Sequence, residues 1–166
     1  MRSLGKLMVL KIVLGMVLLS SQSSLACSFH FGIGDAEQSS VPGAMQVVLS
    51  SLFLEKSGDI ETVEVLPPNA SFQRASWWLT LLAMQLAEGE ASEVLEPNAY
   101  ILLADAMLWT QLESGNRAAI TIDIPEPHQP EQVVMMTQSG LNALVSNRVS
   151  FKQARTMGLV RIYSTR

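Results

Sequence analysis

The sequence QVVMMTQSGLNALVSNRVSFKQARTMGLVRIYSTR, residues 132–166, decides the fold class of this chain. A short apolar run at residues 133–136 predicts a strand, and the spacing of Leu141, Leu144 and Val145 predicts a helix. A second short helix is predicted at residues 151–157, ending at Gly158, and residues 159–163 are rich in β-forming side chains. The stretch therefore predicts a strand, two helices and a closing strand.

The same stretch resembles the C-terminal half of the sterol-carrier-protein type-2-like domain. In that family a strand leads through a Ser/Thr turn into two short helices, and an Ala and a Gly precede the closing strand. The matching positions are Val133, Met135, Thr137, Leu141, Leu144, Ala154, Gly158, Leu159 and Ile162, whereas Asn147 stands where the family commonly has glycine. The resemblance implies an α+β fold and a lipid-like ligand.

Two longer helices are predicted ahead of this unit. Ser40 and Pro42 supply a helix start, apolar side chains recur at helical spacing from Ala44, and Gly58 supplies a stop. Residues 60–66 alternate apolar and acidic side chains, which predicts a short half-exposed strand or an extended segment. A second helix is predicted at residues 71–87, with Gly89 as its stop.

Residues 100–112 fit either a helix or a hairpin. Their Ala, Leu and Met content favours a helix, but Asp105 and Ala106 divide them into two apolar runs that a tight turn would pair. We interpret them as a hairpin. With strands at residues 119–124, 133–136 and 159–163, and a proline-rich loop at 125–131, this predicts an antiparallel five-stranded sheet with helices packed on one face.

The N-terminal residues 1–26 have the pattern of a secretory signal peptide. Arg2, Lys6 and Lys11 precede a short apolar run at residues 12–19, and the small residues Ser24 and Ala26 fit a cleavage site. The remaining residues 27–166 are long and apolar enough for a single domain with a core, since 48% of the chain is hydrophobic and 16% is charged. We therefore predict a periplasmic or secreted protein.

Cys27, the only cysteine, would begin the mature chain. Three interpretations stay open: a tolerated thiol at a chain terminus, the lipid-anchored cysteine of a bacterial lipoprotein, and a copper or zinc site. In the metal site, the free α-amine, the Cys27 thiolate and the His30 imidazole would converge within four residues. No other cofactor is expected.

The helix at residues 71–87 carries apolar side chains around much more than one face, including Trp77, Trp78, Leu82 and Leu86. Such a helix is typical of a packed core and, in a minority of cases, of a cavity for an apolar ligand. The sequence thus predicts these four residues as candidate ligand-binding residues.

Charge divides the chain into an acidic body and a basic C-terminal tip. Residues 35–131 hold fifteen acidic and three basic side chains, a net charge of −12, whereas residues 132–166 hold five cations and no acid. The tip either complements the body of the same chain or docks an anionic partner. A pI near 5.1 without basic–aromatic interleaving argues against nucleic acid.

Catalytic motifs are absent from the sequence: it has no phosphate loop, paired-histidine zinc motif or nucleophile elbow. Asp105 is the most interesting carboxylate, either as a turn former or, if buried, as a group with a raised pKa. We therefore expect an exported binding or accessory protein, with a lipid-like ligand as the first hypothesis, rather than an enzyme. Metal handling through Cys27 and His30, or a structural lipoprotein anchored at Cys27, is the alternative.

Overall fold

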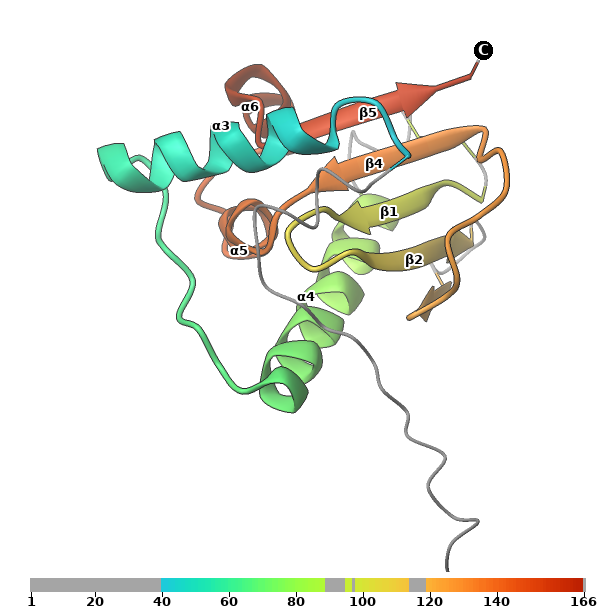
Figure 1. Cartoon of the computed structure of the whole chain (residues 1–166), viewed down its shortest axis with the longest axis horizontal. Helices are drawn as coiled ribbons and strands as arrows, with labels where there is room; N and C mark the ends of the chain where they lie inside the picture. Colours follow the sequence, from blue (N-terminus) through green and yellow to red (C-terminus); the bar gives the residue numbers. More distant parts are fainter. Residues whose placement is uncertain (1–39, 89–94, 97, 114–118, 166) are drawn as a thin grey trace, which may run out of the picture.

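The computed structural model describes residues 40–88, 95–96, 98–113 and 119–165. This part of the chain folds as an α+β domain (Figure 1). Its helices and strands are α3 (Ala44–Ser57), α4 (Pro68–Glu88), β1 (Tyr100–Leu103), β2 (Leu108–Glu113), β3 (Ala119–Ile122), β4 (Gln132–Met136), α5 (Gln138–Val145), α6 (Phe151–Met157) and β5 (Val160–Ser164). The predicted hairpin at residues 100–112 and the predicted strand, helix, helix and strand of the C-terminal stretch are confirmed.

The sheet is mixed, so the prediction of an antiparallel sheet was wrong. Its five strands lie in the order β3-β2-β1-β4-β5. Neighbours pair antiparallel except β1 and β4, which run parallel with Ile101 opposite Val134. The reason is the connection after β3: residues 123–131 return the chain past β2 and β1 to a place beside β1. Side-chain periodicity reports which face a residue takes and carries no information on strand direction.

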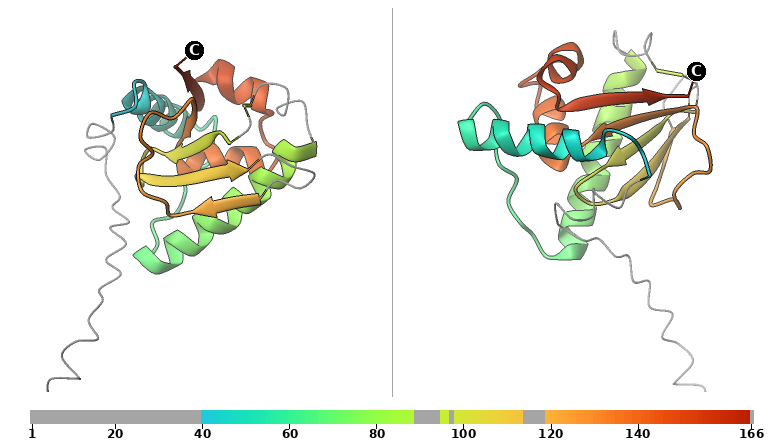
Figure 2. Two further views of the ribbon diagram at one scale, coloured as in Figure 1. Left: turned by 90° about the vertical axis from the view of Figure 1, so that its right-hand side faces the viewer. Right: turned by 45° about the horizontal axis from the view of Figure 1, so that its top comes forward.

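Helices cover both faces of the sheet, so the prediction of helices on one face was also wrong. On one face Leu102, Val133 and Met135 pack with α3, and on the other Ile101 and Val134 pack with α4, α5 and α6. Figure 2 shows α3 and α4 on opposite sides of the strands. Because β1 and β4 are buried on both faces, residues 101–103 and 133–136 are continuously apolar instead of alternating.

Helix α3 begins at a glycine and not at the predicted Ser40 cap. Gly43 is the N-cap residue, with φ of 100° and no side-chain cap, while the Ser40 hydroxyl donates a hydrogen bond to the distant Glu126 carboxylate. Gly58 ends the helix in the left-handed conformation, with φ of 81°, as predicted. Proline begins α4 at Pro68, where its missing N–H costs nothing.

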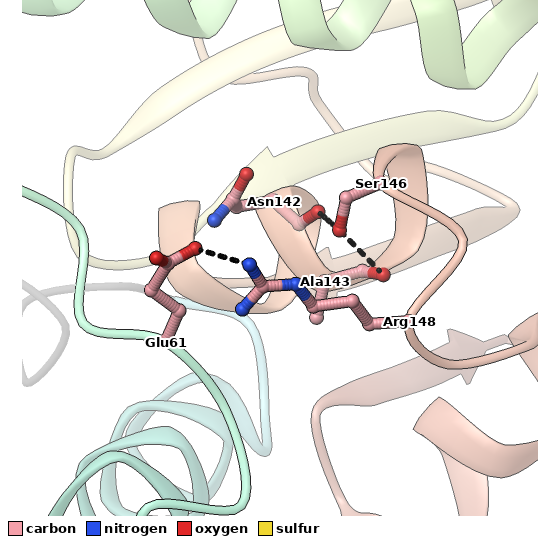
Figure 3. Close-up of polar contacts among 5 residues, drawn as sticks. All are labelled: Glu61, Asn142, Ala143, Ser146 and Arg148. Carbon is pink, nitrogen blue, oxygen red and sulfur yellow. Dashed lines mark hydrogen bonds and ion pairs between the residues drawn. The ribbon is translucent and has the colours of Figure 1, made fainter.

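Residues 60–66 form no strand, so of the two alternatives that the alternating pattern left open the strand is excluded. They connect α3 to α4, with Ile60 buried and Val65 78% exposed. Glu61 instead makes an ion pair with Arg148, 2.9 Å between Oε2 and Nη2 (Figure 3). A strand needs a neighbouring strand for its backbone hydrogen bonds, and this segment lies against none in the described sheet.

Candidate functional site

The four candidate ligand-binding residues of α4 separate into three environments. Leu82 and Leu86 are 2% and 5% exposed and pack in the core between α4 and the sheet. Trp78 is half-buried against the same core, and Trp77 is 62% exposed. Of these four residues, the two leucines are therefore part of the core and only the tryptophans reach the surface.

The outer face of α4 carries an apolar stripe, which we define as Trp77, Leu81 and Met84. These residues are spaced at i, i+4 and i+7, so they lie on one side of the helix. Trp77 and Met84 are 62% and 58% exposed, and Leu81 is half-buried. In the 21 residues of α4 only Arg74 and Glu88 can carry a charge. An exposed helix face with so little charge is unusual for a solvated surface and is typical of a binding surface.

Arg74 lies at the N-terminal end of this stripe and contacts Trp78. Its guanidinium carbon is 5.1 Å from the centre of the Trp78 ring, a cation–π distance. Its Nε and Nη2 atoms are buried and have no hydrogen-bond partner among the described residues. Burial lowers the pKa of Arg74, while the negative charges of Glu64 and Asp105 raise it.

Asp105 is both a turn residue and an enclosed carboxylate. It lies in the four-residue turn between β1 and β2, and both carboxylate oxygens accept the backbone N–H of Gln138, at 3.2 and 3.1 Å. The pKa of Asp105 is raised to about 6, chiefly because the carboxyl group is buried. Hydrogen bonds from Gln138 and from its own backbone amide lower the pKa by less than burial raises it, and the charge of Glu55 raises it further. The carboxyl group thus lies at the positive end of α5 and titrates near neutral pH.

Gln138, the first residue of α5, extends this polar cluster toward α4. It is 1% exposed, and its Oε1 atom accepts a long hydrogen bond of 3.5 Å from the Ser71 hydroxyl of α4. Its Nε2 atom lowers the pKa of Asp105 but makes no hydrogen bond of good geometry within the described residues. We call the four residues Ser71, Arg74, Asp105 and Gln138 the α4–α5 junction.

A second candidate site is an open hollow of about 740 Å³ at the opposite end of β4. Its volume is within the range of small-molecule sites. The hollow lies between the start of α3, the proline-rich connection before β4 and the end of β5. Its lining residues are Ser40, Val41, Pro42, Glu126, Pro127, His128, Gln129, Pro130, Tyr163 and Thr165. Sequence reasoning placed His128 in a loop but gave no signal for this hollow, because its walls come from segments about 85 and 120 residues apart.

The predicted metal site and lipid anchor, Cys27 and His30, lie outside the described residues. Among the residues that are described, no group of three or more His, Cys, Asp or Glu side chains could hold a metal ion. In the same part of the chain, no helix has the length and apolar character to cross a membrane.

Within the described residues, one ion pair joins the basic tip to the acidic body, Arg148 with Glu61 (Figure 3). Both side chains are about half exposed, at 52% and 55%, so the pair stabilises the fold by at most about 1 kcal/mol. Lys152, Arg155 and Arg161 are exposed on α6 and β5. Docking of an anionic partner at this tip stays a prediction.

No protein-family model and no curated protein sequence matches this chain. Among solved structures, it is similar to the stereoselective inverting sec-alkylsulfatase Pisa1 from Pseudomonas sp., with 13% identity and a TM-score of 0.38 over 52% of this chain and 13% of that one. A double mutant of the same enzyme gives 13% identity and a TM-score of 0.38 over 72% and 18% of the two chains. The chain thus spans less than a fifth of the enzyme's length, and a likeness of this extent identifies neither a shared fold nor a shared activity.

Proposed function

We propose that the chain is an exported binding or accessory protein that holds a long-chain, lipid-like ligand against the outer face of α4. The observation that carries the proposal is the apolar stripe, whose Trp77 and Met84 are both more than half exposed on a helix with two ionisable side chains. The resemblance of the C-terminal stretch to the sterol-carrier type supports the class of ligand. The inner face of α4 is filled by Leu82 and Leu86, so the stripe is the part of this helix that is open to a ligand.

The stripe alone supports only weak binding. An acyl chain that covers it removes on the order of 300 Å² of apolar surface from water, which is worth about 7 kcal/mol. Association costs roughly 4 kcal/mol or more in lost translation and rotation. The remainder corresponds to a dissociation constant of roughly a few millimolar, so tight binding requires a polar anchor as well.

The proposal is tested by titrating a fluorescent fatty acid into the purified protein and following its polarisation and the tryptophan emission together. Saturable binding should change the tryptophan emission, because Trp77 and Trp78 lie at the stripe. Trp77→Gln and Met84→Gln should weaken binding. The matched control is Thr165→Trp, which narrows the hollow from its exposed rim and should leave binding unchanged.

Three results would contradict the proposal. Binding that Thr165→Trp abolishes and Trp77→Gln leaves intact would move the ligand to the hollow. A dimer in sedimentation that Trp77→Gln dissolves would make the stripe a contact between two copies. No saturable binding up to the millimolar range that the stripe alone implies, with no lipid co-purified in native mass spectrometry, would leave a packed accessory domain.

The two alternative functions have separate tests. A metal-handling protein should retain copper or zinc through purification and lose it in Cys27→Ser and His30→Ala. A lipoprotein should show a mass increase of several hundred daltons on its N-terminal residue. Neither result depends on α4.

A further inference from the structure

Three hydrogen-bond donors beside the apolar stripe are buried and unsatisfied. They are Nε and Nη2 of Arg74 and Nε2 of Gln138, none of which makes a hydrogen bond of good geometry within the described residues. Nε2 of Gln138 still lies close enough to the Asp105 carboxylate to lower its pKa. A buried donor without a partner destabilises the fold, and a charged one destabilises it more. All three atoms are donors, so the group that would satisfy them must offer acceptor oxygens.

The donors belong to neighbouring elements that meet at the α4–α5 junction. Ser71 lies one helical turn before Arg74 on α4 and donates to the Gln138 side chain of α5. Asp105 touches the Gln138 backbone, and its charge also acts on Arg74. Arg74 in turn precedes Trp77 and Trp78 by three and four residues, so the donors lie at one end of the stripe.

We propose that Arg74 and Gln138 bind the carboxylate of an amphiphilic ligand whose acyl tail lies along Trp77, Leu81 and Met84. This inference rests on the proposed function and adds the polar anchor that the stripe lacks. A guanidinium fork matches the two oxygens of a carboxylate, and Gln138 adds a neutral donor.

The surrounding charges favour a carboxylate over a phosphate. Glu64 and Asp105 act on Arg74, and Glu55 of α3 acts on Asp105. Arg74 therefore faces two acidic side chains, and a third lies near one of them. A phosphate dianion would meet about twice the repulsion that a carboxylate monoanion meets, because Coulomb energy scales with charge.

Asp105 couples this site to pH. Ionised Asp105 partly neutralises the positive charge of Arg74 and repels the ligand carboxylate. Protonated Asp105 has neither effect. The pKa of Asp105 near 6 places this change between about pH 5 and pH 7. Affinity for a carboxylate ligand should therefore fall as pH rises through this range, and Asp105→Asn should flatten the dependence.

The test compares dodecanoate with its neutral analogue dodecan-1-ol by calorimetry on the full purified protein. Dodecanoate should bind more tightly at pH 6 than at pH 8, whereas dodecan-1-ol should bind weakly and equally at both. Arg74→Met keeps the apolar stem and removes the charge, and it should weaken dodecanoate binding roughly 10- to 100-fold. Arg74→Lys should restore part of the loss. The control is Lys56→Met, which removes an exposed cation outside the basic tip and should change nothing.

The outcomes separate the two proposals. If dodecanoate binds but is insensitive to Arg74→Met, at an unchanged melting temperature, the carboxylate site is overturned and the stripe stands. If dodecanoate and dodecan-1-ol bind equally at both pH values, the anchor is likewise overturned. If neither binds, both proposals fail.

Discussion

A single side chain, Asp105, links the β1–β2 turn to the start of α5. Its two oxygens accept the Gln138 N–H at 3.2 and 3.1 Å, and aspartate is a common turn former. The carboxylate also lies at the positive end of the α5 dipole. Enclosure outweighs these favourable contacts, which is why the pKa rises to about 6.

We expect this raised pKa to make the fold less stable as pH rises. The pKa of the unfolded carboxyl group is its ordinary value of 3.8, so between about pH 4 and pH 6 the folded state holds a proton that the unfolded state has lost. The stabilisation is fully present below pH 4 and is lost as pH rises through 6, by on the order of 2–3 kcal/mol. Urea unfolding at pH 4.5 and 7.5 measures it.

Asp105→Asn provides the control, because its amide oxygen can still accept from Gln138 and no longer titrates. The stability of the variant relative to the natural protein should be higher at pH 7.5 than at pH 4.5. An equal difference at the two pH values would mean that the Asp105 carboxyl is not enclosed in solution.

Two glycines with the same backbone conformation form a matched pair. Gly158 and Gly58 end helices with φ of 78° and 81°, so a Cβ at either costs about 1 kcal/mol in strain. A Cβ at Gly158 would also lie 2.9 Å from the Ser50 hydroxyl, whereas nothing lies within 4 Å at Gly58. Gly158→Ala should therefore lower the melting temperature more than Gly58→Ala, and Ser50→Ala should recover part of the excess. Equal losses would show that α3 and Gly158 are not in contact.

Helices α5 and α6 both begin with a side-chain hydroxyl that caps the helix, but the α5 cap is buried and the α6 cap is exposed. The Thr137 hydroxyl accepts from Gly140 N–H at 3.1 Å and donates to the buried Ser51 hydroxyl at 2.8 Å. Ser150 starts α6 with a reciprocal capping box to Gln153 at an exposed site. The cap of α5 thus also joins α3 to the end of β4.

This difference predicts unequal effects of removing the two hydroxyls. Thr137→Val should cost about 2–4 kcal/mol, because the lost cap leaves two buried polar groups without partners. Ser150→Ala should cost about 1 kcal/mol, since water can reach the freed N–H groups. Chemical denaturation of both variants measures the free energies of unfolding. A Thr137→Val loss no larger than that of Ser150→Ala would contradict the buried Thr137–Ser51 contact.

For the whole molecule, the testable expectation is export. We expect cleavage after Ala26, because the basic start, the short apolar run and the Ser24/Ala26 pair meet the requirements of a signal peptide. The intact mass of the protein recovered from its native host should match a chain that begins at Cys27, with added mass if that residue is lipidated. Recovery of the full-length chain in the cytoplasm would contradict export.

The sequence by itself determined the local structure of the described chain, because caps and periodicity act within a few residues. Gly58 and Gly158 marked helix ends, Asp105 marked the hairpin, and residues 133–163 predicted the order of strand, helices and strand. It also predicted the tryptophan-rich helix as the place for a ligand. These signals depend on residues that are close together in the sequence, so they can be interpreted without knowledge of the fold.

Only the tertiary structure decided the direction and the neighbours of the strands, and which side of each helix stayed open. The parallel pairing of β1 with β4 depends on where the chain returns after β3, and the failure of residues 60–66 to form a strand depends on the lack of a strand beside them. Periodicity could not separate Trp77, which faces solvent, from Leu82, which faces the sheet, because the apolar arc of α4 is wider than the sheet covers. The α4–α5 junction joins residues 33 and 67 apart in sequence, and only packing brings such groups together.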